Sequence, residues 1–313
     1  MKTFTSIDEL STVPGPVFLA IGVFDGVHLG HKAVIVHALE DAKKAGGTAV
    51  VVTFDPHPAR ILRPGKAPRL LTSTPHKIRL IRDLGISHLL MIHFDAQLAG
   101  TRPEDFILSL HNACKPLKEI CVGHQWSFGH KRAGNLEMLK EWGDKLGFDE
   151  VGVHAVEVEG EVVSSTLIRG LVEKGELEKA ARFLGRDFTI YGTVIKGQHL
   201  GHELGFPTAN LSTHNEQFPP NGVYAVEAVH HEHTYRGVVN IGVRPTIQNQ
   251  EGERLLELHL FDFNQDIYGD DIEVAFHKFL RPEKKFAGLE ELKAQIARDA
   301  AGAREFFGCK ARC

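Results

Sequence analysis

Two histidines one helical turn apart follow an apolar run near the start of the chain. The stretch "PVFLAIGVFDGVHLGH", residues 16–31, places His28 and His31 around Gly30, just before a segment of helical pattern. A glycine-rich turn that leads into a helix presents backbone N–H groups and the positive end of the helix dipole to an anion. Histidines at positions i and i+3 can both donate hydrogen bonds to phosphate oxygens. The pattern favours a phosphate site, with surface histidines or a metal-ligand pair as the alternatives.

A second group of phosphate-type donors lies far downstream. The stretch "SSTLIR", residues 164–169, sets hydroxyl groups and an arginine at an expected strand-to-helix turn. Donors of this kind suit phosphoryl-type transfer, which depends mostly on positioning and electrostatic stabilisation. The simpler alternative is that one serine only caps the helix. Familiar phosphate loops do not fit, because no GxGxxG follows the first strand and "GHKRAGNL" lacks the Lys-Ser/Thr end of a Walker motif.

The second half of the chain offers oxygen donors of another kind. In "GFPTANL", residues 205–211, the Thr208 hydroxyl and the Asn210 amide are two residues apart and can project on one face, which suits Mg²⁺ and phosphate. The preceding glycines could belong only to turns and bulges. Glu257 in "LELHLFDF" alternates with leucines on either side, and this periodicity alone favours a solvated strand residue.

The elements expected around the first two motifs alternate between strand and helix. Apolar runs predict strands over residues 17–22, 48–55, 87–94, 119–124 and 150–158, with helical patterns between them. Such spacing is typical of βαβ units in a parallel sheet with helices on both faces. Ligands of these sheets bind at the carboxyl ends of strands, which is where the His28 turn is expected.

The pattern changes after two short helical segments, 166–175 and 176–185. Half-alternating strands are then expected over 188–197, 222–231, 234–243, 254–263 and 272–280, followed by an amphipathic helix over 289–307. This order predicts a small antiparallel barrel. The expected fold class is therefore α/β: a doubly wound parallel-sheet domain over 1–185, then an antiparallel β-barrel domain with a terminal helix over 186–313.

Composition limits the classes of partner. The 313 residues carry 36 Lys+Arg against 40 Asp+Glu, a formal net charge of -4, which argues against a dedicated nucleic-acid or membrane binder. The first ten residues include Asp8 and Glu9 where a signal peptide would turn apolar. The four cysteines form no CxxC pair, which is typical of reduced thiols. We therefore expect a cytoplasmic protein, with no prediction of its oligomeric state.

Taken together, these motifs carry a resemblance to a known family. "HLGH" is similar to the HxGH signature of the nucleotidylyltransferase superfamily, and "SSTLIR" to its SSTxxR element. "TFDPHP" and "VGHQWSFGHKRAGN" resemble flavin-side segments of bacterial FAD synthetases, whereas "PTAN" with Glu257 resembles riboflavin kinases. The whole chain resembles the bacterial bifunctional riboflavin kinase/FAD synthetase family. That resemblance implies phosphorylation of riboflavin to FMN by the barrel, adenylylation of FMN to FAD by the first domain, ATP as co-substrate and Mg²⁺ as cofactor.

The resemblance also implies roles for particular residues. His28, His31, Arg169 and Glu257 are the implied catalytic residues, with Glu257 as the base for the ribityl 5′-hydroxyl. The implied ATP site of the adenylyltransferase adds Gly22, Phe24, Asp25, Gly26, Gly30, Ser164, Ser165 and Thr166. The implied flavin contacts are Asp55, His57, Gln125, Trp126, Phe128, Arg244 and Arg281. The implied ATP site of the kinase comprises Gly197, Gly201, Gly205, Pro207, Thr208 and Asn210, of which Thr208 and Asn210 serve Mg²⁺.

The chain departs from the family pattern at a few positions. Gln125 replaces Asp or Asn, Trp126 replaces Phe, Asn135 replaces Asp, and His202 replaces an arginine of the kinase glycine loop. Two other functions compete with the family's. One is an adenylyltransferase for another phosphorylated metabolite fused to an unrelated barrel; it leaves "PTAN" and Glu257 unexplained. The other is a non-catalytic flavin-binding regulator, favoured only by the departures at Gln125 and His202.

Overall fold

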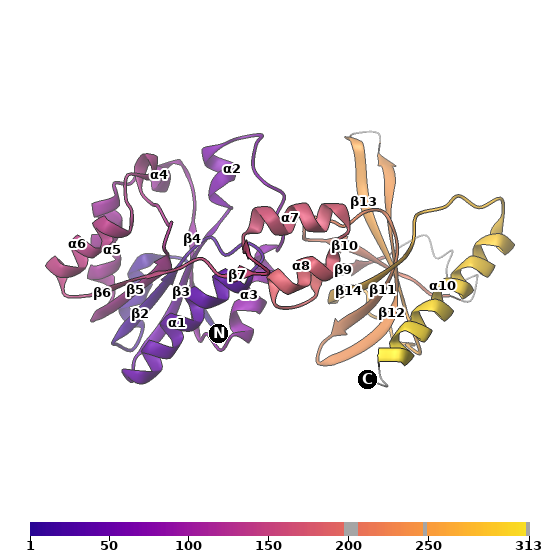
Figure 1. Ribbon diagram of the computed structural model, residues 1–313, viewed down its shortest axis with the longest axis horizontal. Helices are drawn as coiled ribbons and strands as arrows, with labels where there is room; N and C mark the ends of the chain where they lie inside the picture. Colours follow the sequence, from indigo (N-terminus) through magenta and orange to yellow (C-terminus); the bar gives the residue numbers. More distant parts are fainter. Residues whose placement is uncertain (197–205, 247–248, 311–313) are drawn as a thin grey trace. The chain divides into compact units, whose positions relative to one another are not determined.

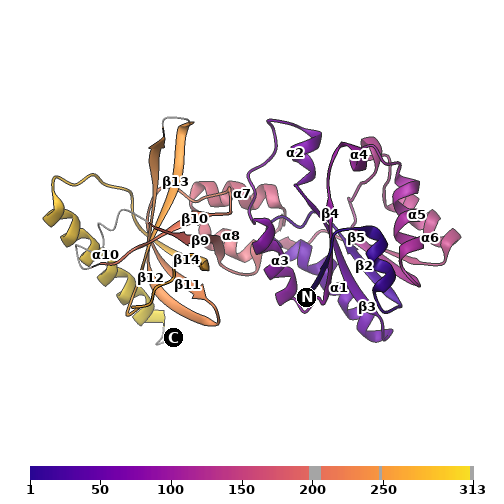
Figure 2. The same ribbon diagram turned by 180° about the vertical axis from the view of Figure 1, so that it is seen from behind.

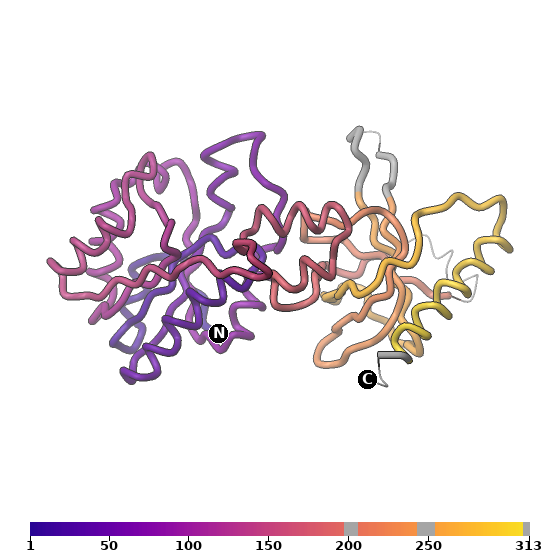
Figure 3. Tube along the Cα trace, viewed as in Figure 1, coloured from indigo at the N-terminus to yellow at the C-terminus, as the bar shows by residue number. Residues whose placement is uncertain are grey.

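The computed structural model describes residues 1–196, 206–246 and 249–310 (Figure 1), and Figure 3 draws the same chain as a tube. It divides into two compact units, the first comprising Met1–Arg69 and Thr74–Ser165, the second Leu70–Ser73 and Thr166–Cys313. The second unit is thus discontinuous in sequence. Its short segment is held through its own backbone carbonyls. The Asn215 side chain donates a hydrogen bond to the Leu71 carbonyl at 2.6 Å, and the Gln217 N–H donates one to the Leu70 carbonyl at 3.0 Å.

The first unit is built on a parallel sheet in the order β1-β4-β3-β2-β5-β6 (Figure 1). Its strands are β1 (Lys2–Phe4), β2 (Val17–Ile21), β3 (Thr48–Asp55), β4 (His88–His93), β5 (Leu117–Gly123) and β6 (Asp149–Val153). The apolar runs expected to be strands form the middle and one edge of this sheet, and the short edge strand β1 was not expected. Because β2 lies between β3 and β5, the strand order reverses at its side, and this switch point is where such sheets bind ligands.

Helices cover both faces of the sheet. They are α1 (Leu29–Lys44), α2 (Pro58–Leu62), α3 (Thr74–Asp83), α4 (Ala96–Ala99), α5 (Pro103–Ala113) and α6 (Leu136–Leu146), with short 3₁₀ turns η1 (Ile7–Thr12) and η2 (His130–Arg132). One core cluster joins α1 and α3 to Phe18, Ala20 and Val51, and the other joins α5 and α6 to Leu19, Val50 and Val52. Alternate residues of β2 and β3 thus face opposite layers, as buried parallel strands require. A small ribbon of β7 (Glu157–Val158) and β8 (Glu161–Val162) follows β6.

The second unit is a closed antiparallel barrel in the order β10-β13-β12-β11-β14-β9 (Figure 2). Its strands are β9 (Phe188–Ile195), β10 (Ala209–Thr213), β11 (Gly222–His230), β12 (His233–Thr246), β13 (Asn249–Leu260) and β14 (Asp271–Arg281). The fold class predicted from the sequence is confirmed in both units. The strand missing from the prediction is β10, which begins inside the "PTAN" stretch.

Among the residues that the structure describes, the second unit contains three helices. They are α7 (Ser165–Lys174), α8 (Leu177–Leu184) and α10 (Leu289–Lys310), the first of which begins one residue before the unit does. Helix α8 packs on β9 and β14, and α10 packs on β11, β12 and β14. The compact units therefore divide at Ser165, twenty residues before the domain boundary at Gly185 expected from the sequence. Helix α8 belongs to the second unit because it packs on β9 and β14 and carries the buried side chains of Phe183 and Leu184.

Candidate active sites

The loop between β2 and α1 has an unusual backbone. Phe24, Gly26 and Val27 have φ values of 52°, 86° and 40°, in the left-handed region that side chains with a Cβ disfavour. Phe24 and Val27 are nevertheless buried. An added Cβ at Gly22 would lie 2.7 Å from the Phe24 ring, so a side chain there would displace that buried ring. Backbone strain retained in a buried loop is common at functional sites.

This loop brings the two histidines of the HxGH motif into contact. His28 is the N-cap of α1, and its Nδ1 atom accepts a hydrogen bond from the His31 backbone N–H at 3.3 Å. Because Nδ1 accepts, the neutral His28 ring carries its proton on Nε2, which is a donor. The two rings stack at 3.5 Å between centroids, and the Phe24 ring meets His31 edge-on at 5.4 Å. A Cβ at Gly30 would lie 3.3 Å from the His28 ring, so glycine lets that ring fold over the first turn.

The structure also joins the start of the "SSTLIR" stretch to this loop. The Ser165 hydroxyl donates a hydrogen bond to the Asp25 carbonyl at 2.9 Å, across 140 residues of sequence. Asp25 itself is buried. Ser165 begins α7, and Thr166 and Arg169 follow on that helix within the second unit. The two motifs predicted to act together are therefore in direct contact through Ser165.

A buried lysine that the sequence analysis did not single out lies under the same loop. The Lys77 ammonium, on α3, donates to the carbonyl oxygens of Val23 and Phe54 and to the Thr53 hydroxyl at 3.2–3.3 Å. Burial lowers the pKa of Lys77 to about 8, although nearby Asp25 and Asp55 favour the charged form. Lys77 thus ties the ends of β2 and β3 together. Its position on the same face of α3 as buried Ile81, four residues on, was the available signal.

An aromatic cavity of about 180 Å³ opens beside these strand ends. Its walls include Val23, Phe54, Phe94, Trp126, Phe128 and Arg132. Trp126 stacks on Phe128 with a centroid distance of 4.3 Å and an interplanar angle of 13°. A mostly apolar cavity lined by two stacked aromatic rings and an arginine can take a flat aromatic ring. Two of the predicted flavin residues, Trp126 and Phe128, line it, as do Val23, Phe54 and Arg132, which the sequence analysis did not single out.

The other predicted flavin residues of the first unit do not line this cavity. Asp55 ends β3 and accepts a hydrogen bond from the Thr74 hydroxyl at 2.8 Å. His57 caps α2 through its Nδ1 atom, which accepts from the Ala59 N–H. Gln125 is exposed and lines a neighbouring depression that shares Trp126, Ser127 and Arg132 with the cavity. Their assignment as flavin contacts stays a prediction.

In the barrel, strand register places three polar side chains in one row. Glu257 on β13 pairs with Asn210 on β10 and, on its other side, with Asn240 on β12. Directly paired residues of antiparallel strands project from the same face, about 5 Å apart. The neighbouring leucines, Leu256 and Leu258, are buried on the opposite face. Asn210 is buried as well. If these residues were only solvated strand residues, Asn210 would be exposed. Asn240 was not recognised in the sequence.

The "PTAN" segment is held in place by the histidine two residues after Glu257. The His259 ring hydrogen-bonds to the Pro207 carbonyl at 2.9 Å and meets Phe206 edge-on. Pro207 and Thr208 line a cavity of about 290 Å³ together with Leu258, Phe263 and Tyr268. Thr208 thus lines this cavity, whereas Asn210 and Glu257 pair on the strand face opposite Leu258.

Several predicted residues are placed elsewhere or not at all. Arg281, at the end of β14, forms a bidentate ion pair with Asp299 of α10 at 2.7–3.0 Å. The structure thereby gives Arg281 a role in anchoring the terminal helix. Gly197, Gly201 and Gly205, and the departure at His202, lie outside the described residues, as does the side chain of Arg244 on β12.

A parallel sheet with a phosphate-type loop at its switch point, followed by a barrel with a row of oxygen donors, is the arrangement of a two-domain nucleotide-dependent transferase. Family models agree: an FAD synthetase model matches residues 11–167 and a riboflavin kinase model residues 184–307. The chain belongs to the family of bifunctional riboflavin kinase/FMN adenylyltransferases. A member from Escherichia coli (strain K12) is 38% identical over 310 residues, 98% of each chain.

A second curated relative supports the same conclusion, and a solved structure shares the fold. The Bacillus subtilis (strain 168) member is 36% identical over 293 residues, 92% of each chain. A solved structure described as a macrolide-efflux protein from Streptococcus pneumoniae is 28% identical and superposes with a TM-score of 0.81, covering 96% of this chain and 97% of the other. Among the described residues of this chain, no helix is both long and apolar enough to span a bilayer. The family predicted from the motifs is confirmed, with ATP as co-substrate and riboflavin, FMN and FAD as substrates and products.

Proposed function

We propose that the loop of the first unit carries the adenylyl transfer. The FMN phosphate oxygen attacks the α-phosphorus of ATP, and pyrophosphate leaves. His28 and His31 donate hydrogen bonds to the charge that develops on the α-phosphate oxygens, while Ser165, Thr166 and Arg169 bind the departing phosphates. The observation that carries this assignment is the stacked pair of imidazoles at a helix N-terminus, in contact with the second motif through the Ser165–Asp25 hydrogen bond.

The aromatic cavity is proposed to take the flavin ring of FMN. Trp126 and Phe128 form its stacked wall, and the Arg132 guanidinium lies at its edge. The cavity also reaches Val23, whose neighbour Phe24 contacts His31. A flavin held there would leave its phosphate on the side of the loop that carries the histidines.

In the barrel, the proposal makes Glu257 the base of the kinase reaction. The riboflavin 5′-hydroxyl oxygen attacks the γ-phosphorus of ATP, its proton passes to Glu257, and ADP leaves. The register of Asn210, Glu257 and Asn240 supports this role, since amides on both sides can hold the carboxylate and the phosphate in place. His259 is a positioning residue, because it fixes the Pro207 carbonyl just before Thr208.

Magnesium is proposed at the same row. The Thr208 hydroxyl and the Asn210 amide oxygen are hard oxygen donors of the type that Mg²⁺ accepts together with nucleotide phosphates. Bound there, Mg²⁺ would neutralise charge on the ATP phosphates. The cytoplasmic location stays a prediction; the buried free thiols of Cys114 and Cys121 agree with it.

The division of labour is tested by product analysis. The intact chain is incubated with riboflavin and MgATP, or with FMN and MgATP, and the flavins are separated by chromatography. His28→Ala and His31→Ala are expected to lower FAD formation at least a hundredfold and to leave FMN formation unchanged. His37→Ala, two turns further along α1, is the matched control and should retain both activities. Equal loss of both activities in a folded His28 variant would refute the assignment.

Glu257→Gln tests the kinase assignment separately. General-base catalysis typically contributes ~10²–10⁴-fold, so FMN formation should fall by that factor in kcat while riboflavin binding changes little. FAD formation from supplied FMN should persist and reports the fold of the variant. A wild-type rate of riboflavin phosphorylation under conditions where chemistry limits turnover would exclude Glu257 as the base.

A further inference from the structure

Two histidines and an aspartate come together at one end of β11, away from the polar row of the barrel. His230 ends β11, His231 begins the turn to β12, and Asp270 directly precedes β14. A ring nitrogen from each histidine and a carboxylate oxygen lie within 4.8 Å of one another. The row residue Asn240 pairs with Val223 at the start of β11, whereas the histidines lie at its end. The cluster is therefore distinct from the proposed magnesium site.

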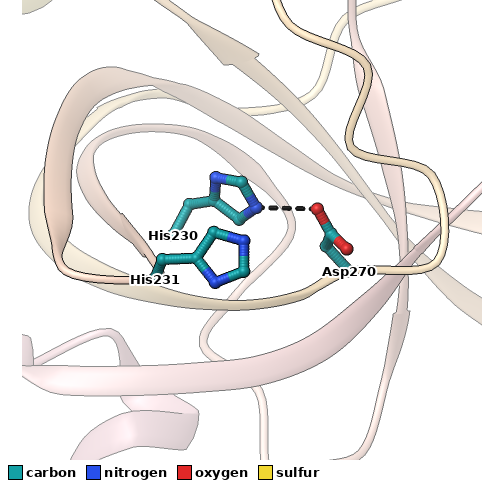
Figure 4. Close-up of side chains that lie close together, drawn as sticks. All are labelled: His230, His231 and Asp270. Carbon is teal, nitrogen blue, oxygen red and sulfur yellow. Dashed lines mark hydrogen bonds and ion pairs between the residues drawn. The ribbon is translucent and has the colours of Figure 1, made fainter.

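The first ligand position is rigid and already oriented. The His230 side chain is buried, and its Nε2 atom hydrogen-bonds to an Asp270 oxygen at 2.8 Å (Figure 4). The Phe263 ring stands edge-on to the His230 ring at 6.3 Å and packs in turn against Tyr235 at 4.8 Å. These contacts fix the direction in which Nε2 points, and a metal would only require that the ring proton move from Nε2 to Nδ1.

The second histidine reaches the cluster through a strained backbone. Successive residues of a strand point to opposite faces, so His230 and His231 would normally diverge. His231 instead has a φ of 52°, a left-handed conformation that glycine or asparagine adopts at far lower cost. As a result its ring lies 4.2 Å from that of His230, and Figure 4 shows both rings beside the Asp270 carboxylate. Within the described parts of the chain, the His231 ring nitrogens make no hydrogen bond.

We propose that His230, His231 and Asp270 form a binding site for a divalent first-row transition metal, with Zn²⁺ as the natural probe. Two imidazoles and one carboxylate are a common ligand set for such ions, and three protein ligands leave a fourth position to water. Access is open, because His231 is exposed and the Asp270 side chain is 39% exposed. A bound ion would link the β11–β12 turn to the start of β14, two segments that are separate in sequence.

The test measures metal binding directly on the full chain. The protein is dialysed against a chelator, then titrated with Zn²⁺ by calorimetry without nucleotide, and with Co²⁺ by visible absorption. The wild type is expected to bind one ion at this site with the intense absorption of tetrahedral Co²⁺. His231→Asn keeps a residue that tolerates the left-handed turn, and Asp270→Asn removes the carboxylate charge. Each is expected to weaken binding at least tenfold and to lose the Co²⁺ band.

Matched controls separate this site from other histidines and carboxylates. His233→Ala removes an exposed histidine at the start of β12, two residues after His231, and should bind as the wild type does. His37→Ala removes the histidine of a second cluster, with Asp41 and Glu119, and should also leave the affinity unchanged. Riboflavin phosphorylation by each variant reports that the barrel is folded. The proposal is overturned if the wild type binds no ion, if His231→Asn and Asp270→Asn bind it as tightly as the wild type, or if the ion is lost in His37→Ala instead.

Discussion

Glu119 is expected to destabilise the first unit at neutral and alkaline pH. It lies on β5, is only 5% exposed, and faces Asp41 of α1, which in turn pairs with His37 and Lys44. Its Oε1 atom has no hydrogen-bond partner among the described residues. Burial raises the pKa of Glu119 to about 7, and repulsion from Asp41 and Asp149 adds to this, whereas Lys118 acts in the opposite direction.

The magnitude and sign follow from proton linkage. The folded state holds the Glu119 proton up to about pH 7, whereas the unfolded chain releases it near the ordinary value of 4.5. Between these values the folded state binds more protons, so stability falls as pH rises and the loss is complete above pH 7. The difference corresponds to about 3 kcal/mol at pH 8 and to less than about 1 kcal/mol at pH 5. Glu119→Gln, which keeps the shape and cannot ionise, should therefore stabilise the unit by about these amounts.

The assay can isolate the first unit, because both tryptophans of the chain, Trp126 and Trp142, belong to it. Urea unfolding followed by tryptophan fluorescence is compared for the wild type and Glu119→Gln at pH 5 and pH 8. Glu141→Gln, an exposed glutamate of α6, is the matched control and should change little at either pH. A gain that is the same at both pH values, or no gain at pH 8, would refute the account of Glu119 as a buried, repelled carboxyl group.

Two further predictions concern residues that the structure revealed. Lys77→Met should lower FAD formation at least tenfold while FMN formation persists, because the ends of β2 and β3 lose the cation that both contact. In the wild type, FAD formation should decline as pH rises past about 8, because Lys77 loses its proton there. Asp299→Asn should destabilise the barrel by about 3 kcal/mol, because it leaves the Arg281 guanidinium without its carboxylate. Thermal inactivation of riboflavin phosphorylation measures this effect, and an unchanged midpoint would contradict the anchoring role of Arg281.

Much of the fold could be predicted because its strands are long apolar runs. The strands β2, β3, β4 and β5 are bounded by turn residues and separated by helical patterns, which leaves one reasonable class of sheet. β1 was missed because three residues are too few to show a period. β10 was missed because a proline precedes it and only Leu211 in it is clearly apolar.

The sites were predictable where a motif is contiguous in sequence and not where pairing creates them. His28 and His31 are one turn apart, so their contact follows from helix geometry. Asn240 enters the polar row only through the register of β12 and β13, which no local pattern encodes. Lys77 was missed because a lysine in a charged helix is usually solvated; its place on the helix face of Ile81 was the one signal, and the packing of α3 shows that it is buried.

The short segment Leu70–Ser73 has a consequence for how such a gene can be divided. It belongs to the second unit, although the chain on both sides of it belongs to the first. No single break in the reading frame can therefore yield two polypeptides that each contain a complete unit. A break at Gly185 or at Ser165 would leave the Asn215 side chain without the Leu71 carbonyl that it binds. A second unit encoded on its own would lack the segment Leu70–Ser73. It would need substitutions around Asn215, or another segment in place of Leu70–Ser73, to match the stability of the fused protein.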